Sequence, residues 1–222
     1  MAQKIKLHPE TPHQKRVFDI VDMLNSGSVM LFPTDSRYAL GCELSNKKGL
    51  DRIRAIRRVS KDHLFTLLCD SLSGLARFAH ISDNNFKIIK RLIPGPFTFI
   101  LPATKEVPKL MVNASRKTVG FRVPDSPICQ SILGELGSPI LATTAKNLDP
   151  DGNDVEVYSP DDLFHIYDKL VDLVIDDEQP LNPESSTIID MTGNMAVITR
   201  RGLGIERVEE AFALQNLEFE YS

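Results

Sequence analysis

The pattern of hydrophobic and polar residues predicts a chain in which helices and short buried strands follow one another irregularly. Apolar residues recur at helical spacing over 13–25, and the apolar run 29–32 then predicts a buried strand. A second helix is expected over 46–59, with arginines beside its apolar face. Further helices are predicted at 71–78, 83–92, 127–136 and 205–217, and further strands at 65–69, 97–102, 118–123, 139–144, 171–175, 187–191 and 195–199.

The order of these elements indicates the fold class. Strands and helices mix without the strict alternation of repeated β-α-β units. The turn residues 192–194 (Thr-Gly-Asn) predict a hairpin between the last two strands. We therefore expect an α/β protein with a mixed, twisted sheet in a single domain.

Composition narrows the class of protein. The 222 residues are 42% apolar and 25% charged, as in an ordinary globular protein. The sequence has no apolar stretch long enough to cross a bilayer, and its first residues lack the apolar core of a secretory signal. Cys42, Cys69 and Cys129 are an odd set without metal-ligand spacing, which predicts buried free thiols. These features predict a cytoplasmic protein with no membrane association.

Charge is distributed unevenly along the chain. The net charge of -4 argues against a generally basic nucleic-acid binder. Basic residues are nevertheless concentrated over 47–61, where Asp51 is the only acidic residue. A basic patch on a mildly acidic protein suits a small anion, or a local RNA contact, better than a long duplex.

The loop after the first strand has the composition of a binding site. The apolar run ends at Pro33, and residues 34–37 (Thr-Asp-Ser-Arg) follow at once. Two hydroxyls, a carboxylate and a guanidinium in one loop favour a ligand site, and Gly41 would let the backbone approach the ligand. The alternative is an ordinary turn in which Asp35 and Ser36 bond their own backbone.

Polar and basic residues also gather at the ends of other predicted elements, at 57–63, 122–124, 143–147, 185–187 and 200–202. Ligands of open sheets bind at strand ends, and arginine pairs with phosphate and carboxylate groups. We therefore expect an anion site for nucleotide phosphates and a carboxylate-bearing cosubstrate. The sequence contains no pattern of a nucleophile activated by a base and neither common glycine-rich nucleotide motif. Catalysis would rest on positioning and charge stabilisation.

Simpler explanations exist for individual residues in these segments. The arginines of 52–58 can form the solvated face of a helix. Arg122 can belong to a structural ion pair, and His63 can be a packed residue with a satisfied ring. The remaining histidines have no metal-ligand spacing, so a zinc site is not expected.

Five motifs taken together resemble one family. In chain order they are 33–42 (Pro-Thr-Asp-Ser-x-Tyr-Ala-Leu-Gly-Cys), 94–98 (Pro-Gly-Pro-Phe-Thr), 122–124 (Arg-Val-Pro), 143–145 (Thr-Thr-Ala), and 186–190 (Ser-Thr-Ile-Ile-Asp) with 200–202 (Arg-x-Gly). Their order is similar to that of the YrdC-like family, which includes the threonylcarbamoyl-adenylate synthases. Ala39 and the stretch 65–69 look most like the YciO branch.

The resemblance implies a fold and an activity. The fold would be a single YrdC-like domain over 1–222, with a core at about 13–202 and a C-terminal tail or helix at 205–222. Its twisted, mostly open mixed sheet, with flanking helices, would surround a basic concave cavity. L-Threonine, bicarbonate and ATP, with Mg²⁺ bound to the ATP, would give threonylcarbamoyl-adenylate and pyrophosphate. The product serves tRNA threonylcarbamoyladenosine modification through partner proteins, and several family members are described as binding double-stranded RNA.

The resemblance also implies roles for individual residues. Thr34 and Arg122 would hold threonine, with Arg122 pairing its carboxylate. The nucleotide and its phosphates would be contacted by Arg57, Arg58, Lys61, Thr144, Asn147, Ser186 and Arg200. No catalytic residue and no protein metal ligand is implied.

One departure from the family's pattern concerns phosphate binding. The family's Lys-x-Arg pair is Arg57-x-Val59 here, so an apolar residue stands in place of the second cation. Arg58 or Lys61 would replace that cation only if the loop followed a different path.

Two further departures lie elsewhere in the predicted site. The family's Ser-x-Asn element is 144–146 (Thr-Ala-Lys), with Asn147 one residue late, so that either Asn147 or Lys146 faces the nucleotide. Arg37 stands where a smaller residue is expected and adds positive charge at the mouth. The sequence therefore predicts either a synthase or a non-catalytic, or weakly catalytic, module that binds double-stranded RNA or tRNA in the same basic cavity. An enzyme acting on another carboxylate-bearing nucleotide remains a third interpretation.

Overall fold

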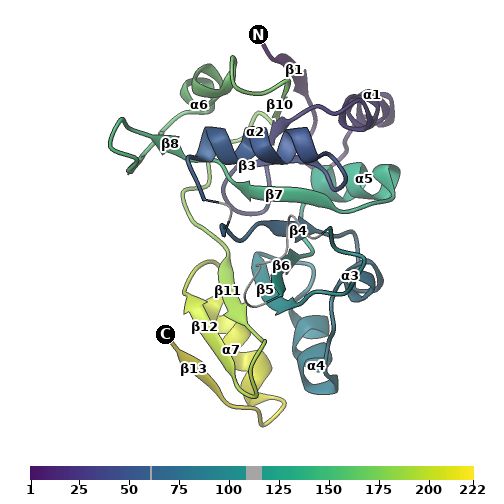
Figure 1. Ribbon diagram of the computed structural model, residues 1–222, viewed down its shortest axis with the longest axis vertical. Helices are drawn as coiled ribbons and strands as arrows, with labels where there is room; N and C mark the ends of the chain where they lie inside the picture. The colour runs from purple at the N-terminus through teal and green to yellow at the C-terminus, as the bar shows by residue number, and fades with distance from the viewer. Residues whose placement is uncertain (61, 109–116) are drawn as a thin grey trace.

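A long mixed β-sheet forms the body of the protein (Figure 1). The computed structural model describes residues 1–60, 62–108 and 117–222. In spatial order the strands are β1 (Gln3–Lys6), β10 (Leu173–Asp176), β2 (Met30–Phe32), β3 (Ala39–Glu43), β7 (Ile140–Thr144), β4 (Thr66–Leu68), β6 (Thr118–Arg122), β5 (Phe97–Pro102), β11 (Thr187–Asp190), β12 (Ala196–Arg200) and β13 (Phe219–Tyr221). The short hairpin of β8 (Asn147–Leu148) and β9 (Asp154–Val155) stands apart from this sheet.

The helices divide between two hydrophobic clusters. One cluster contains α1 (Gln14–Asn25) and α5 (Pro127–Leu136), which pack against each other. The other contains α2 (Lys47–Arg57), α3 (Leu72–Phe78), α4 (Asp83–Leu92), α6 (Pro160–Tyr167) and α7 (Ile205–Ala213). Successive strand residues alternate between the clusters, as Leu67 and Leu68 do, because side chains of a strand point to opposite faces of the sheet.

The face of the sheet that carries α1 and α5 is only partly covered by helices. Ala39, Leu68 and Ala142 belong to its apolar cluster. Farther along the same face the register places Leu68 opposite Arg122, and Ile188 opposite both Thr98 and Arg200. Polar side chains therefore lie on a part of this face that no helix covers, beside the apolar cluster. This arrangement creates the cavity described below.

Serine caps explain where several helices begin. The side chains of Ser71, Ser82, Ser126 and Ser159 each accept a hydrogen bond from the backbone N–H three residues later. In α5 and α6 a proline follows the cap at the first helical position, where a missing N–H costs no hydrogen bond. The caps of α3, α4 and α5 agree with the helices predicted from the sequence, and α1 to α5 lie within two residues of the predicted limits.

Strand β3 was not predicted, because its sequence lacks the usual alternation of polar and apolar residues. It is buried between β2 and β7, and Gly41 lies at its centre. A Cβ at Gly41 would lie 2.8 Å from Phe32 Cε1 and 2.9 Å from Ile140 Cγ2. Gly41 therefore permits close packing of core side chains, and the expectation that it lets the backbone approach a ligand is wrong.

The C-terminal helix is shorter than predicted. Helix α7 ends at Ala213, and Asn216 adopts φ 52° before β13 pairs in parallel with β12. The predicted hairpin of β11 and β12 is confirmed, since the two strands are antiparallel. β1, α6, β8, β9 and β13 were not predicted from the sequence.

Two expectations from composition can be compared with this structure. Cys42, Cys69 and Cys129 are free and buried, as predicted, and burial raises the pKa of each thiol to about 12. Within the described ranges, no helix combines the length and the hydropathy that a membrane crossing requires.

Candidate functional site

The loop between β2 and β3 is held by hydrogen bonds of Thr34. Its hydroxyl accepts from the Ser36 N–H at 3.1 Å and donates to the Arg37 carbonyl at 2.9 Å. Thr34 and Ser36 hydroxyls also lie 3.2 Å apart. These bonds form a local turn, but they are made by Thr34 and not by Asp35 and Ser36, as the simpler interpretation had it. The turn fixes the direction of Ser36 and Arg37 at the end of the strand.

Arg122, at the end of β6, forms a buried ion pair with Asp35. One terminal nitrogen donates to Asp35 and the other to the Ser36 hydroxyl at 2.9 Å. The second Asp35 oxygen accepts from the Asp125 N–H at 2.9 Å. The structural ion pair proposed as the alternative for Arg122 is therefore present. Any ligand carboxylate at Arg122 would share it with Asp35, and the Arg122 Nε has no hydrogen-bond partner in the described part of the chain.

Arg200 and Ser186 are joined across β11 and β12. The Arg200 Nε donates to the Ser186 carbonyl at 2.8 Å, and its Nη2 donates to the Ser186 hydroxyl at 2.8 Å. That hydroxyl is also 3.0 Å from the hydroxyl of Thr98 on β5. Burial lowers the pKa of Arg200, and the nearby guanidinium groups of Arg122 and Arg37 lower it further. Three cations are thus drawn together by the fold, which favours an anion between them.

Arg57, in the last turn of α2, is a buried cation without a counterion among the residues that the structure describes. It is 6% exposed and makes no hydrogen bond or ion pair to the described residues; its Nε is buried without a partner. Burial lowers its pKa, and Arg37 adds to this effect, while Asp154 and Tyr167 oppose it. A buried guanidinium with unused donors is unfavourable by itself, and a bound anion would remove that penalty.

The neighbouring arginines of α2 point to other partners. Arg52 pairs with Asp172 at 2.7 Å, and Arg54 with Asp51 at 3.2 Å. Arg58 adopts φ 50° after the helix and donates to the carbonyls of Asp149, at 2.6 Å, and Pro150, at 3.3 Å. Its guanidinium therefore fastens the β8–β9 turn, away from the cavity. Lys61 lies outside the described residues.

The predicted residues meet at one cavity of about 260 Å³. Those that line it are Thr34, Arg57, Arg122, Thr144, Ser186 and Arg200. Its lining includes two further cations, Arg37 and Lys146, and no carboxylate among the residues that the structure describes. Ala39, Leu64, Leu68, Ala142 and Ile188 supply an apolar part of the wall. The cavity thus combines strong positive charge with a surface on which a flat apolar group can lie.

His63 also lines the cavity, as a packed residue. Its Nε2 is 3.2 Å from the Thr143 hydroxyl, and its ring stands edge-on to Phe65 with centroids 5.0 Å apart. Burial lowers the pKa of His63, and Arg57, Lys146 and Arg54 lower it further. The imidazole is therefore neutral at pH 7, which makes it a hydrogen-bonding group rather than a sixth cation at the site.

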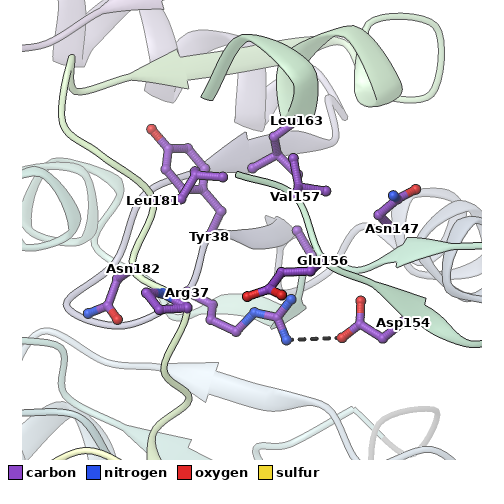
Figure 2. Close-up of a pocket in the computed structure, with 11 residues that line it drawn as sticks. Arg37, Tyr38, Asn147, Asp154, Glu156, Val157, Leu163, Leu181 and Asn182 are labelled. Carbon is purple, nitrogen blue, oxygen red and sulfur yellow. Dashed lines mark hydrogen bonds and ion pairs between the residues drawn. The ribbon is translucent and has the colours of Figure 1, made fainter. Parts of the chain in front are cut away.

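A second pocket, of about 310 Å³, adjoins the cavity through Arg37 (Figure 2). Asn147 lines this second pocket, whereas Lys146 lines the cavity. The backbone therefore follows the path in which lysine, and not Asn147, occupies the cavity. Figure 2 shows the Arg37 guanidinium extended toward Asp154 of the β8–β9 hairpin, at 3.0 Å.

Comparison with known proteins places this geometry in a family. The family model described as "Telomere recombination" (Sua5_yciO_yrdC) matches residues 22–202. The chain is 38% identical to the uncharacterized protein YciO of Escherichia coli over 92% of this chain and 97% of that one. The chain belongs to the Sua5/YciO/YrdC family. The family resemblance inferred from the motifs is confirmed.

Solved structures of family members show the same fold. The crystal structure of E. coli YciO has a TM-score of 0.84, with 92% of this chain and 97% of that chain covered. Sua5 of P. abyssi, solved in complex with L-threonine, has a TM-score of 0.85 at 22% identity and covers this whole chain with 63% of its own. A threonylcarbamoyl-AMP synthase of Vibrio vulnificus is 29% identical over 57% of this chain and 69% of its own length.

Several cavity residues were not assigned from the sequence. Thr66 and Thr98 line the cavity but were not among the predicted site residues, and Ser36 and Thr143 were predicted only as parts of the segments 34–37 and 143–147. Thr98 belongs to the family motif 94–98, and Thr66 faces the cavity because its strand neighbour Leu67 faces the core. Strand alternation, applied to the motifs of the Sua5/YciO/YrdC family, is the signal that would have found them.

Proposed function

We propose that the protein binds ATP together with L-threonine in this cavity and forms threonylcarbamoyl-adenylate. The observation that carries the proposal is the convergence of separate segments on one space lined by five cations and, within the described chain, by no carboxylate. Arg57 adds specific support, since it is buried and pairs with no carboxylate in the described ranges. Membership of a family that includes threonylcarbamoyl-AMP synthases supports the choice of reaction.

The proposed reaction has two steps. The amine of threonine attacks the carbon of bicarbonate, and loss of water leaves a carbamate. A carbamate oxygen then attacks the α-phosphorus of ATP, the bond to the β-phosphate breaks, and pyrophosphate leaves. The cations would stabilise the negative charge that develops on the phosphates, which is the main contribution expected from a site without an activated nucleophile.

Individual residues have distinct roles in this proposal. Arg57 and Lys146 would contact the phosphates from one wall, and Arg200 with Ser186 would contact the nucleotide from the other. Arg122, braced by Asp35, would attract the threonine carboxylate, and Thr34 would keep the loop in place for it. Thr144 would add a neutral donor at the end of β7.

Mg²⁺ would be bound to the ATP phosphates in this proposal. The described lining offers it no carboxylate, and no cluster of three or more metal-ligating side chains occurs in the described ranges. Hard cations prefer oxygen ligands, which the triphosphate supplies. In this proposal the metal enters the site with the substrate.

The test is pyrophosphate release by the purified protein. We expect release that requires threonine and bicarbonate together, and its loss in Arg57→Gln. Arg77→Gln is the matched control, because Arg77 is exposed and pairs with Glu106 outside the cavity. Absence of release under conditions in which a family synthase is active would reject the synthase. Calorimetry of ATP with and without threonine would show whether the two ligands bind together.

A second candidate is an RNA-binding module without synthase turnover. It is favoured by the position of Arg58, which bonds the β8–β9 turn and leaves the apolar Val59 in place of the family's second cation. A cavity that keeps positive charge but loses a phosphate ligand would still attract an RNA backbone. tRNA and other partners of a modification pathway are part of this proposal.

Salt dependence distinguishes this candidate. Retention of tRNA or of a short RNA duplex should fall steeply between low and physiological salt, and Arg57→Gln should reduce the slope. A flat response, or no retention at low salt, would reject RNA binding. Val59→Arg is informative for both candidates, because a gain in ATP affinity would show that the missing cation limits nucleotide binding.

A further inference from the structure

The two cavity cations that depart from the family pattern share one counterion. Arg37 and Lys146 both line the cavity, one from the loop before β3 and the other just after β7. The same Asp154 oxygen, Oδ2, lies 3.0 Å from the Arg37 Nη1 and 3.7 Å from the Lys146 Nζ. A single oxygen held between a guanidinium and an ammonium is the arrangement that a phosphate oxygen would adopt there.

Asp154 reaches the cations from a separate and weakly attached element. The β8–β9 hairpin forms the small second sheet, and both residues of β9, Asp154 and Val155, are exposed. Besides Asp154, the hairpin turn is tied to the body of the protein by the two hydrogen bonds from Arg58. The hairpin therefore lies outside the hydrogen-bonded main sheet.

The cations themselves are firmly placed. The hydroxyl of the buried Tyr167 accepts from the Lys146 N–H at 3.0 Å and donates to the Lys146 carbonyl at 2.7 Å. Arg37 follows the turn at Thr34, and the Arg37 carbonyl accepts a hydrogen bond from the Thr34 hydroxyl. Arg57, which pairs with no carboxylate of the described residues, lines the same cavity. Two cations on ordered backbone thus hold the Asp154 carboxylate, and a third lines the cavity that they share.

We propose that Arg37 and Lys146 form a phosphate subsite which Asp154 occupies when no ligand is bound. The inference rests on the proposed function, in which the cavity accepts a polyphosphate. A phosphate group of the ligand displaces Asp154, pairs with Arg37, Lys146 and Arg57, and releases the β8–β9 hairpin. The subsite supplies, from the opposite side, the positive charge that Val59 fails to provide. Displacement also frees Arg37, which lines both the cavity and the second pocket.

The experiment uses inorganic pyrophosphate as the probe, with binding measured by calorimetry on the full chain. Asp154→Asn removes the internal carboxylate and keeps its size, so pyrophosphate should bind about three- to tenfold more tightly. Arg37→Gln and Lys146→Gln should each weaken binding. Glu156→Gln is the matched control, because Glu156 lies on the same segment, lines only the second pocket and bonds the Tyr158 hydroxyl. It should change the affinity less than twofold.

Hydrogen exchange over 147–155 provides a second readout. Pyrophosphate should speed exchange of the hairpin amides in the unmodified chain, and Asp154→Asn should show fast exchange without ligand. If Asp154→Asn and Glu156→Gln tightened pyrophosphate binding equally, the effect would come from net charge alone, and the subsite would be overturned. Unchanged or weaker binding by Asp154→Asn would also overturn it. Failure of the unmodified chain to bind pyrophosphate would instead reject the polyphosphate cavity together with the subsite. The failure of the subsite alone is thus distinguishable from the failure of the proposed function.

Discussion

The hydroxyl groups of Thr98 and Ser186 lie 3.0 Å apart and connect β5 to the residue that precedes β11. Both residues are buried, and Ser186 also receives Arg200 through its hydroxyl and its carbonyl. The contact therefore supports a cation of the cavity as well as the junction between two strands. The contact between Thr98 and Ser186 should therefore affect both the stability of the protein and its ligand binding.

Ser186→Ala should affect both properties. Loss of the hydroxyl leaves the Thr98 hydroxyl and one Arg200 nitrogen without their partner, at a cost of about 1–3 kcal/mol in unfolding free energy. ATP affinity should fall as well, since Arg200 loses part of its support. Urea unfolding and calorimetry measure the two effects. Ser185→Ala is the matched control, and an equal loss in both variants would show that the Ser186 hydroxyl has no special role.

Arg57→Met should stabilise the protein while abolishing anion binding. Methionine fills similar space without a buried charge, so the unfolding free energy should rise by about 1 kcal/mol or more. ATP or pyrophosphate binding should be lost. Arg52→Met, which breaks the exposed pair with Asp172, should lower stability by less than about 1 kcal/mol and leave binding intact. Destabilisation by Arg57→Met would mean that Arg57 has a structural partner in solution.

Asp35→Asn tests the buried ion pair with Arg122. Removing one charge of a buried pair leaves the other uncompensated, and we expect a loss of about 3–5 kcal/mol in unfolding free energy. Glu178→Gln, in the exposed pair with Lys6, should cost less than about 1 kcal/mol. Denaturant midpoints compare the two. Similar small losses would indicate that water screens the Arg122–Asp35 pair.

Gly202→Ala should be strongly unfavourable, because the new Cβ would lie 2.3 Å from the backbone oxygen of Ser185. The strand ends must separate to admit it, at about 1–3 kcal/mol or more. Gly134→Ala, in α5 with nothing within 4 Å of the new Cβ, should instead stabilise by about 0.5–1 kcal/mol. Thermal melts check both signs, and equal effects would refute the close approach at Gly202.

Protonation of the buried His63 should make the protein less stable in mild acid. Burial lowers its pKa below the usual 6.5, so the unfolded chain takes up a proton first as the pH falls. The contribution of His63 is therefore complete above about pH 6.5 and declines from there toward its folded pKa. His63→Gln should flatten this part of the profile. Unfolding free energies measured from pH 8 to pH 5 provide the comparison, and identical slopes would exclude His63 as the source.

The sequence predicted which segments form the cavity better than it predicted what each side chain does there. Thr34, Arg57, Arg122, Thr144, Ser186 and Arg200 meet because strand ends and family motifs locate the backbone. The partners of the arginines depend on long-range packing that no local pattern encodes. Arg57 and Arg58 are adjacent in sequence, yet one faces the cavity and the other bonds a distant turn because the helix ends between them.

The same limit explains the ambiguity at 146–147. Tyr167 bonds the Lys146 N–H and carbonyl, and so helps to hold the backbone where the lysine enters the cavity and Asn147 the second pocket. Tyr167 lies in α6, a helix that was not predicted, so this information was missing. The buried strand β3 escaped prediction for a related reason, because a strand covered on both faces loses the alternation that identifies strands.

The position of β10 between β1 and β2 has a consequence for biosynthesis. On an emerging nascent chain, β1 and β2 cannot complete their pairing until residues 173–176 have left the ribosome. Until then the outer edge of β2 remains open to association with other chains, a known hazard of long-range β pairing. Residues 173–176 are translated long after β1 and β2, and they complete the pairing of both strands.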